Sequence, residues 1–174
     1  MTRPFNRPTL LLALFLLPAL GCSNTDSKGS EPAAEPVAQT PEALVKHSAE
    51  LRRAGKGKEA VDAAVQAFTL ARSGPRVTER LELAKAQAAA GSSAGAINEI
   101  KSLENEKRTQ NVPVDEVLIA EVYAQIGDPN AVFRWLSRAV EAKSPNLATV
   151  QTNPDLEPVK TDPRWAQFIA TIPK

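Results

Sequence analysis

The chain has 174 residues, and its 21 lysines and arginines almost balance its 20 aspartates and glutamates, for a formal net charge of +1. Proteins that bind nucleic acids usually gather a basic excess into a patch, so this composition predicts no nucleic-acid partner. The single cysteine and the single histidine exclude an internal disulfide, a histidine-rich zinc site and a His-Glu-x-x-His motif. We therefore expect neither a metal site nor a bound cofactor.

Residues 1–21 have the pattern of an export signal. Arg3 and Arg7 precede an uncharged, leucine-rich run over residues 10–17, as in signal peptides. A transmembrane helix needs about 20 apolar residues, so a permanent membrane-spanning helix is the weaker interpretation of this run. Removal of residues 1–21 would also remove both arginines and bring the formal charge to about −1.

The signal ends in Ala19-Leu20-Gly21-Cys22, which resembles the lipobox of bacterial lipoproteins. The resemblance implies that Cys22 receives diacylglycerol before cleavage, and that covalent lipid is the only added group we expect. Two or three acyl chains are enough for stable membrane anchoring. The residue after the cysteine is Ser23. In Gram-negative bacteria the absence of an aspartate at this position favours transfer to the outer membrane, where we expect the protein to face the periplasm. The alternative is cleavage by an ordinary signal peptidase, which would leave Cys22 as a free thiol.

Residues 22–40 are interpreted as the acylated cysteine and a flexible linker. Between residues 23 and 40 the only large apolar side chain is Val37, so this segment cannot build a core. A flexible chain of this length reaches about 25 Å. We expect a tether that holds the folded part near the bilayer, although the AAEPVA sequence within it could instead pack onto the domain.

Residues 41–174 are expected to form one helical domain. Thr40 can cap the first helix, with Pro41 at the first helical position, and Gly55 is expected to end it. A second helix is predicted over about residues 58–72, before a Ser-Gly-Pro sequence that breaks it. Two helices joined by a short corner form a hairpin.

The hairpin recurs along the chain. The sequences RAGKGKEAV, AAGSSAGAI and QIGDPNAVF align on Gly55, Gly91 and Gly127, which are 36 residues apart in each case. A fixed period of this size indicates stacked supersecondary units. The period also places Leu136, nine residues after the third glycine, in the core.

The repeated pattern resembles the tetratricopeptide repeat (TPR) family, whose repeat is a pair of antiparallel helices of about 34 residues. The resemblance is sharpest in AEVYAQIGDPNAVFRWLSRAVE, followed by NPDLEPVKTDPRWAQFI, which looks like a closing repeat with a capping tail. It implies an all-α, helical-hairpin solenoid of about three repeats with C-terminal capping helices.

The dense aromatic cluster near residue 130 is interpreted as structural. Asp128 is placed to cap a helix that has Pro129 at its first position, and no partner for acid–base catalysis is apparent. Phe133 and Trp135 are expected in the core. An Asp-Pro sequence at residues 162–163 is expected to cap the last helix, whose apolar stripe should close the end of the stack.

No catalytic residue is predicted, so we expect a protein that is not an enzyme. The TPR resemblance implies binding of a protein or peptide in the cell envelope, as a scaffold or assembly factor. In that family the first helix of each pair lines the concave surface, where Arg52, Lys85 and Glu121 would be exposed as candidate partner-binding residues. This mixed set disfavours a ligand bound through its carboxylate tail. Two alternatives stay open: a helical envelope enzyme acting on peptidoglycan, and a structural spacer that binds nothing.

Overall fold

The computed structural model of the protein describes residues 40–173, and these residues form helices with no β-strand. The expected signal, the lipidation site Cys22 and most of the expected linker lie outside the described residues. The elements in chain order are α1 (Pro41–Arg53), α2 (Gly57–Leu70), α3 (Val77–Ala89), α4 (Ser93–Gln110), α5 (Glu116–Ile126), α6 (Pro129–Glu141), the 3-10 helices η1 (Pro145–Thr152) and η2 (Pro154–Val159), and α7 (Arg164–Thr171).

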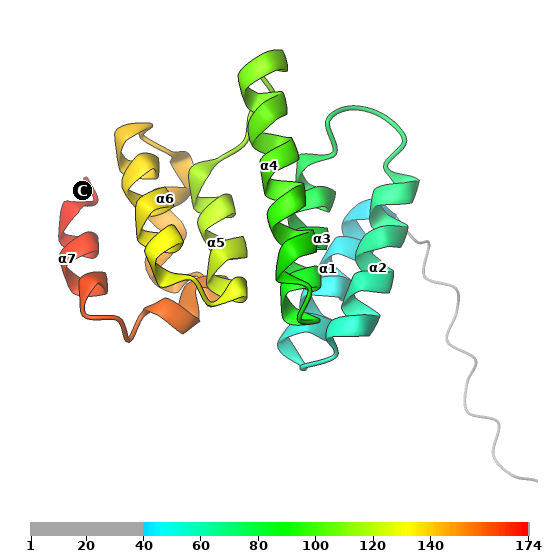
Figure 1. Ribbon diagram of the computed structural model, residues 1–174, viewed down its shortest axis with the longest axis horizontal. Coiled ribbons are helices and arrows are strands. Elements are labelled where there is room, and N and C mark those ends of the chain that lie inside the picture. The colour runs from blue at the N-terminus through cyan, green and yellow to red at the C-terminus, as the bar shows by residue number, and fades with distance from the viewer. Residues whose placement is uncertain (1–39, 174) are drawn as a thin grey trace, which may run out of the picture. The chain divides into compact units, whose positions relative to one another are not determined.

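The first six helices form three consecutive hairpins, α1–α2, α3–α4 and α5–α6 (Figure 1). Each hairpin has one of the aligned glycines at its corner: Gly55, Gly91 and Gly127 have φ angles of +75°, +85° and +81°. This left-handed conformation favours glycine. The predicted corners are confirmed. The first helices also contact one another from hairpin to hairpin, α1 with α3 and α3 with α5.

Two predicted helix caps are confirmed. Thr40 Oγ1 accepts a hydrogen bond from the Ala43 N–H at 3.2 Å, and Asp128 Oδ1 accepts one from the Ala131 N–H at 3.0 Å. A proline stands at the first position of each helix, α1 and α6, where its missing N–H has no intrahelical partner to lose. Asp128 therefore has the structural role that its position predicts.

The main hydrophobic core lies between α3 and α6 and extends into the tail. Leu136 is fully buried, as its place in the repeat predicts, and Phe133 and Trp135 are buried beside it. The first hairpin is packed differently, because alanines such as Ala60 and Ala64 form a small separate cluster with Leu83. Small side chains at these positions let two helices approach closely.

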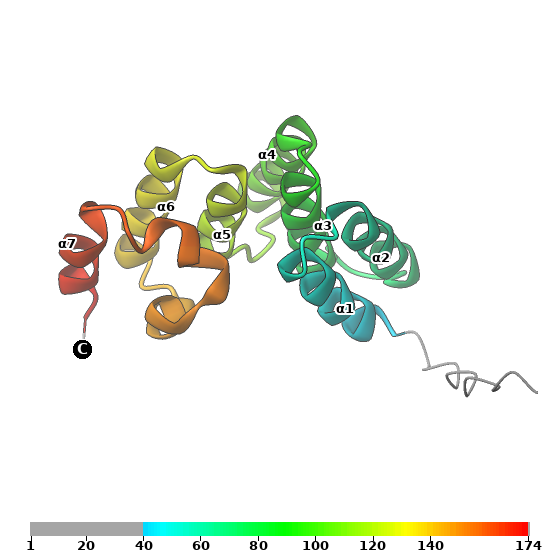
Figure 2. The same ribbon diagram turned by 90° about the horizontal axis from the view of Figure 1, so that it is seen from below.

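The C-terminal tail differs in part from the expected cap. Helix α7 does pack on α6, and the Phe168 ring meets Phe133 edge-on with centroids 6.4 Å apart. Asp162 Oδ1 accepts the Arg164 N–H at 2.9 Å, although α7 itself begins at Arg164 without a side-chain N-cap. Between α6 and α7, however, η1 and η2 turn back and pack against α5. Figure 2 shows this orange segment beside α5, on the side away from α4.

Within residues 40–173, none of the helices combines the length and the apolar character that crossing a membrane requires. The longest, α4, continues through the polar run Glu104–Gln110, and Asn111 caps it with a φ angle of 55°. Arg80 of α3 forms ion pairs with Glu99 of α4 at 3.1 Å and with Glu106, within this polar run, at 2.7 Å.

Candidate functional site

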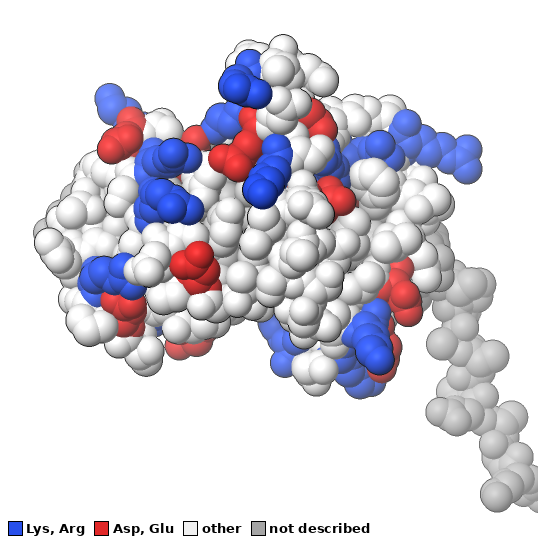
Figure 3. All heavy atoms as spheres, in the orientation of Figure 1, with Lys and Arg blue, Asp and Glu red and all other residues white. Residues whose placement is uncertain are grey.

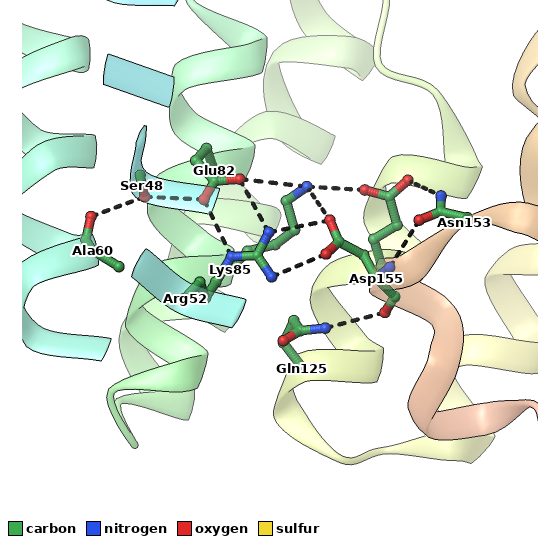
Figure 4. A network of polar contacts seen from close by, with 9 residues as sticks. Ser48, Arg52, Ala60, Glu82, Lys85, Gln125, Asn153 and Asp155 are labelled. Carbon is green, nitrogen blue, oxygen red and sulfur yellow. Dashed lines mark hydrogen bonds and ion pairs between the residues drawn. The ribbon is translucent and has the colours of Figure 1, made fainter. Parts of the chain in front are cut away.

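Five charged side chains from four elements meet on the side of the hairpins formed by their first helices (Figure 4). This charged cluster consists of Arg52 from α1, Glu82 and Lys85 from α3, Glu121 from α5 and Asp155 from η2. Four of the five are buried, and the Lys85 side chain keeps 12% of its surface exposed. Charged side chains are rarely buried unless they are paired, and each of these five is.

Arg52 makes two bidentate contacts. Its Nη1 and Nη2 atoms donate to Asp155 Oδ1 and Oδ2 at 3.0 and 3.1 Å, and its Nε and Nη2 atoms donate to Glu82 Oε1 and Oε2 at 3.2 and 3.4 Å. The planar guanidinium group matches two carboxylates in this arrangement, which fixes the geometry as well as the charge. Arg52 therefore joins α1 to both α3 and the C-terminal tail.

Lys85 is the second cation of the cluster. Its Nζ atom donates to Asp155 Oδ2 at 2.9 Å and to Glu121 Oε2 at 3.0 Å, and lies 3.5 Å from Glu82 Oε2. An ammonium group has three donors, so the three carboxylates can use all of them. The Asp155 carboxylate is consequently held by two cations from two neighbouring hairpins.

Uncharged polar side chains form hydrogen bonds with the carboxylates at the edges of the cluster. Ser48 Oγ lies 2.9 Å from Ala60 O and 3.0 Å from Glu82 Oε1, so its hydroxyl hydrogen can bond to either oxygen. On the opposite edge Asn153 Nδ2 donates to Glu121 Oε1 at 2.7 Å. Each carboxylate oxygen of the cluster accepts at least one hydrogen bond, as a stable buried polar network requires.

Residues 153–156, Asn-Pro-Asp-Leu, lie at the centre of these contacts and are called the docked segment below. Asn153 Oδ1 accepts the Asp155 N–H at 2.9 Å and so starts the η2 turn. The Asp155 backbone oxygen accepts from Gln125 Nε2 of α5 at 3.1 Å, and Leu156 is fully buried. Side chains from three helices, α1, α3 and α5, thus all hold this one short segment in place.

The environment keeps Asp155 and Lys85 ionised. Burial opposes the charged form of Asp155, but Lys85 and Arg52 outweigh this effect and lower its pKa to about 2. Burial likewise disfavours the charged form of Lys85, yet the surrounding carboxylates, Glu121 first, raise its pKa above the usual value. Asp155 and Lys85 therefore both stay charged near neutral pH.

The expectation that Arg52, Lys85 and Glu121 are exposed on a concave surface is wrong. Arg52 and Glu121 are only 6% and 5% exposed, because the docked segment covers them. The structure does bring these three residues together, but with Glu82 and Asp155, which the sequence interpretation missed. A signal was present: Glu121 is flanked at helical spacing by Val117 and Ala124, a pattern typical of a buried face.

The surface formed by the first helices nevertheless holds one side-chain carboxylate, that of Asp155 in the same chain. Beside the docked segment lies an open groove of about 350 Å³, lined by Arg52, Arg53, Gln125, Pro154, Asp155, Glu157 and Pro158. Arg53 is exposed at its rim. The lining of the groove combines two arginines with two carboxylates. A general acid needs a pKa near the working pH, and the pKa of Asp155, about 2, is far from that range.

Two other surface properties bear on ligands. Among residues 40–173, histidine, cysteine, aspartate and glutamate side chains nowhere form a group of three that could hold a metal ion. On the face shown in Figure 3, basic and acidic side chains occur in small interspersed groups separated by uncharged areas.

Comparison of the chain with protein-family models, with curated proteins and with solved structures found no significant match.

Proposed function

We propose that this protein is a membrane-anchored lipoprotein of the cell envelope whose folded part is a non-catalytic, TPR-like scaffold or assembly factor. Cys22 carries the lipid, and the outer membrane is its location, with the hairpins facing the periplasm. The signal pattern that ends at Cys22 supports the anchor. The three hairpins at a 36-residue spacing support a TPR-like solenoid.

One observation carries the binding role: the first helices of all three hairpins contribute side chains to hold a single polypeptide segment. Arg52, Lys85 and Gln125 each donate hydrogen bonds to Asp155. Stacked helical hairpins form extended surfaces that proteins with such repeats use for binding. The surface formed by α1, α3 and α5 has the chemistry to bind a protein or peptide in the same way.

The charged cluster also argues for binding over catalysis. Each carboxylate in it is hydrogen-bonded to Arg52 or Lys85, and the contacts of Asp155 with both cations lower its pKa to about 2. A glycan-cleaving pair needs one carboxyl group that stays protonated and can donate its proton. The groups of the cluster are suited to holding a ligand in place.

Site-specific photo-crosslinking in intact cells tests this proposal. A photo-reactive amino acid at exposed positions of the full chain, including Arg53 at the groove and Ala94 on α4, should yield a discrete crosslinked partner protein from at least one position. Absence of any discrete product from a scan of the exposed surface would favour the structural spacer. Turnover of peptidoglycan fragments by the purified protein would favour the enzyme.

A further inference from the structure

We infer that the docked segment, residues 153–156, occupies a peptide-binding site in cis, and that an acidic segment of the partner protein replaces it. The replacing segment carries an aspartate followed by a large aliphatic residue within a short turn. This inference rests on the proposed binding function and names the chemistry of its ligand.

The contacts of the docked segment depend on its sequence. The Asn153 amide donates to Glu121, the Asp155 carboxylate accepts from Arg52 and Lys85, and Leu156 is fully buried. Only one contact from the helices, Gln125 to the Asp155 backbone oxygen, is independent of side-chain identity. The site therefore selects an aspartate with an aliphatic neighbour, as a peptide-binding groove selects its ligand.

The ionic part of this contact is suited to exchange. Moving Arg52, Lys85 and Asp155 out of water costs free energy that offsets much of their mutual attraction. A buried ion pair therefore stabilises a fold little more than well-packed apolar side chains in its place would. Leaving the two cations without their carboxylate is costly, however. Exchange is thus favoured only when an incoming carboxylate takes the place of Asp155.

The surroundings give an incoming segment access. The docked segment begins at Asn153, between η1 and η2, and continues into η2. Its own Pro154 is exposed, and so are Glu157 and Pro158, which follow it. The open groove reaches Arg52 and Asp155 from the solvent side. A partner segment can contact Arg53 at the rim before the docked segment leaves.

A peptide titration tests the inference. A fluorescent peptide with the sequence of residues 151–160, QTNPDLEPVK, is titrated against the full chain in detergent and followed by fluorescence anisotropy. Leu156→Ala in the chain weakens the resident segment, so the peptide should bind this variant at least about tenfold more tightly than the wild type. A control peptide with asparagine in place of aspartate should lose at least about tenfold in affinity.

Two results of the titration would overturn the inference. One is the absence of peptide binding to a Leu156→Ala chain whose circular dichroism shows intact helices. The other is formation of a dimer in which the tail of a second copy fills the site, because the occupant would then be this chain itself. Light scattering after gel filtration separates the dimer from the monomer.

Amide hydrogen exchange of the unmodified protein provides a second test, which does not depend on whether the Leu156→Ala chain folds. Replacement of the docked segment by a partner segment requires that the docked segment leaves α5 without global unfolding of the protein. Amides of η2 (Pro154–Val159) should then exchange at least about tenfold faster than those of α3 and α5. Equal rates would show that the segment is an inseparable part of the core and would overturn the inference.

The crosslinking experiment separates the two proposals. Crosslinks from Arg53 that disappear in the presence of excess QTNPDLEPVK peptide support both. A discrete partner that crosslinks from Ala94 and never from Arg53 supports the binding function but overturns the assignment of the ligand to this site.

Discussion

Arg52 and Asp155 are 103 residues apart in the sequence, yet their side chains form a bidentate ion pair with N–O distances of 3.0 and 3.1 Å. The pair links the first helix of the first hairpin to the tail that follows the third. The C-terminal tail therefore does more than close one end of the stack. It also contacts side chains from the first helices of all three hairpins.

Arg52→Ala should lower the free energy of unfolding by about 3 to 5 kcal/mol, because it leaves the buried carboxylates of Asp155 and Glu82 without their main partner. The neighbouring Arg53 is exposed, and Arg53→Ala should cost less than about 0.5 kcal/mol. Urea titration at neutral pH compares the two variants. Equal effects would show that Arg52 is not buried in the folded protein.

Asp155→Asn should remove a pH-dependent part of the stability. The pKa of Asp155 is about 2 in the folded protein, against 3.8 when unperturbed, so its contribution is present above pH 4 and is lost as the pH falls from about 4 to about 2. The contribution is on the order of 2 kcal/mol. The difference in unfolding free energy between wild type and variant should therefore be constant above pH 5 and shrink below pH 4.

Glu157→Gln is the matched control for that experiment. Glu157 pairs with Lys160, but its side chain is 71% exposed, and exposed pairs contribute little. This substitution should change the unfolding free energy by less than about 0.5 kcal/mol at pH 7. A difference between wild type and Asp155→Asn that does not depend on pH would contradict the ionised, paired state of Asp155.

Leu136→Ala tests the core register of the third hairpin. Leu136 is fully buried, so its truncation should cost about 2 to 5 kcal/mol, as for other core leucines. Leu70, at 39% exposure, offers a leucine control, and Leu70→Ala should cost clearly less. A Leu136→Ala effect below about 0.5 kcal/mol in a urea titration would show that the register is wrong.

Cys22→Ser tests the proposed membrane anchor. If Cys22 is acylated, the substitution should abolish incorporation of labelled palmitate and release the protein into the soluble periplasmic fraction, because the acyl chains supply the membrane affinity. Cell fractionation and labelling measure both effects. Unchanged labelling and fractionation would contradict the lipoprotein proposal.

The hairpins could be predicted from the sequence because their signals are local. A glycine that adopts positive φ, as Gly127 does, or a capping residue such as Asp128 acts within a few residues. The spacing of these signals then predicts burial of Leu136, which the structure confirms. The predicted second helix was off by one or two residues at each end, since α2 spans Gly57–Leu70.

The charged cluster could not be predicted in the same way. Its contacts join residues as distant as Arg52 and Asp155, and charged residues on a helix usually face water. The polar sequence of residues 151–155 gives no sign that it packs against three helices. The sequence signals that these helix faces are covered are small and apolar neighbours at helical spacing, namely Leu81 and Ala88 around Lys85 and Val117 and Ala124 around Glu121.

The coupling between Arg52 and Asp155 tests most directly whether the tail is held on the first helices by this pair. A double-mutant cycle with Arg52→Ala, Asp155→Ala and both changes together, followed by urea unfolding, measures it. Because the two side chains share two hydrogen bonds in a buried setting, we predict a coupling energy of about 1 to 3 kcal/mol. A coupling below about 0.3 kcal/mol, with additive single effects, would contradict the arrangement on which both proposals rest.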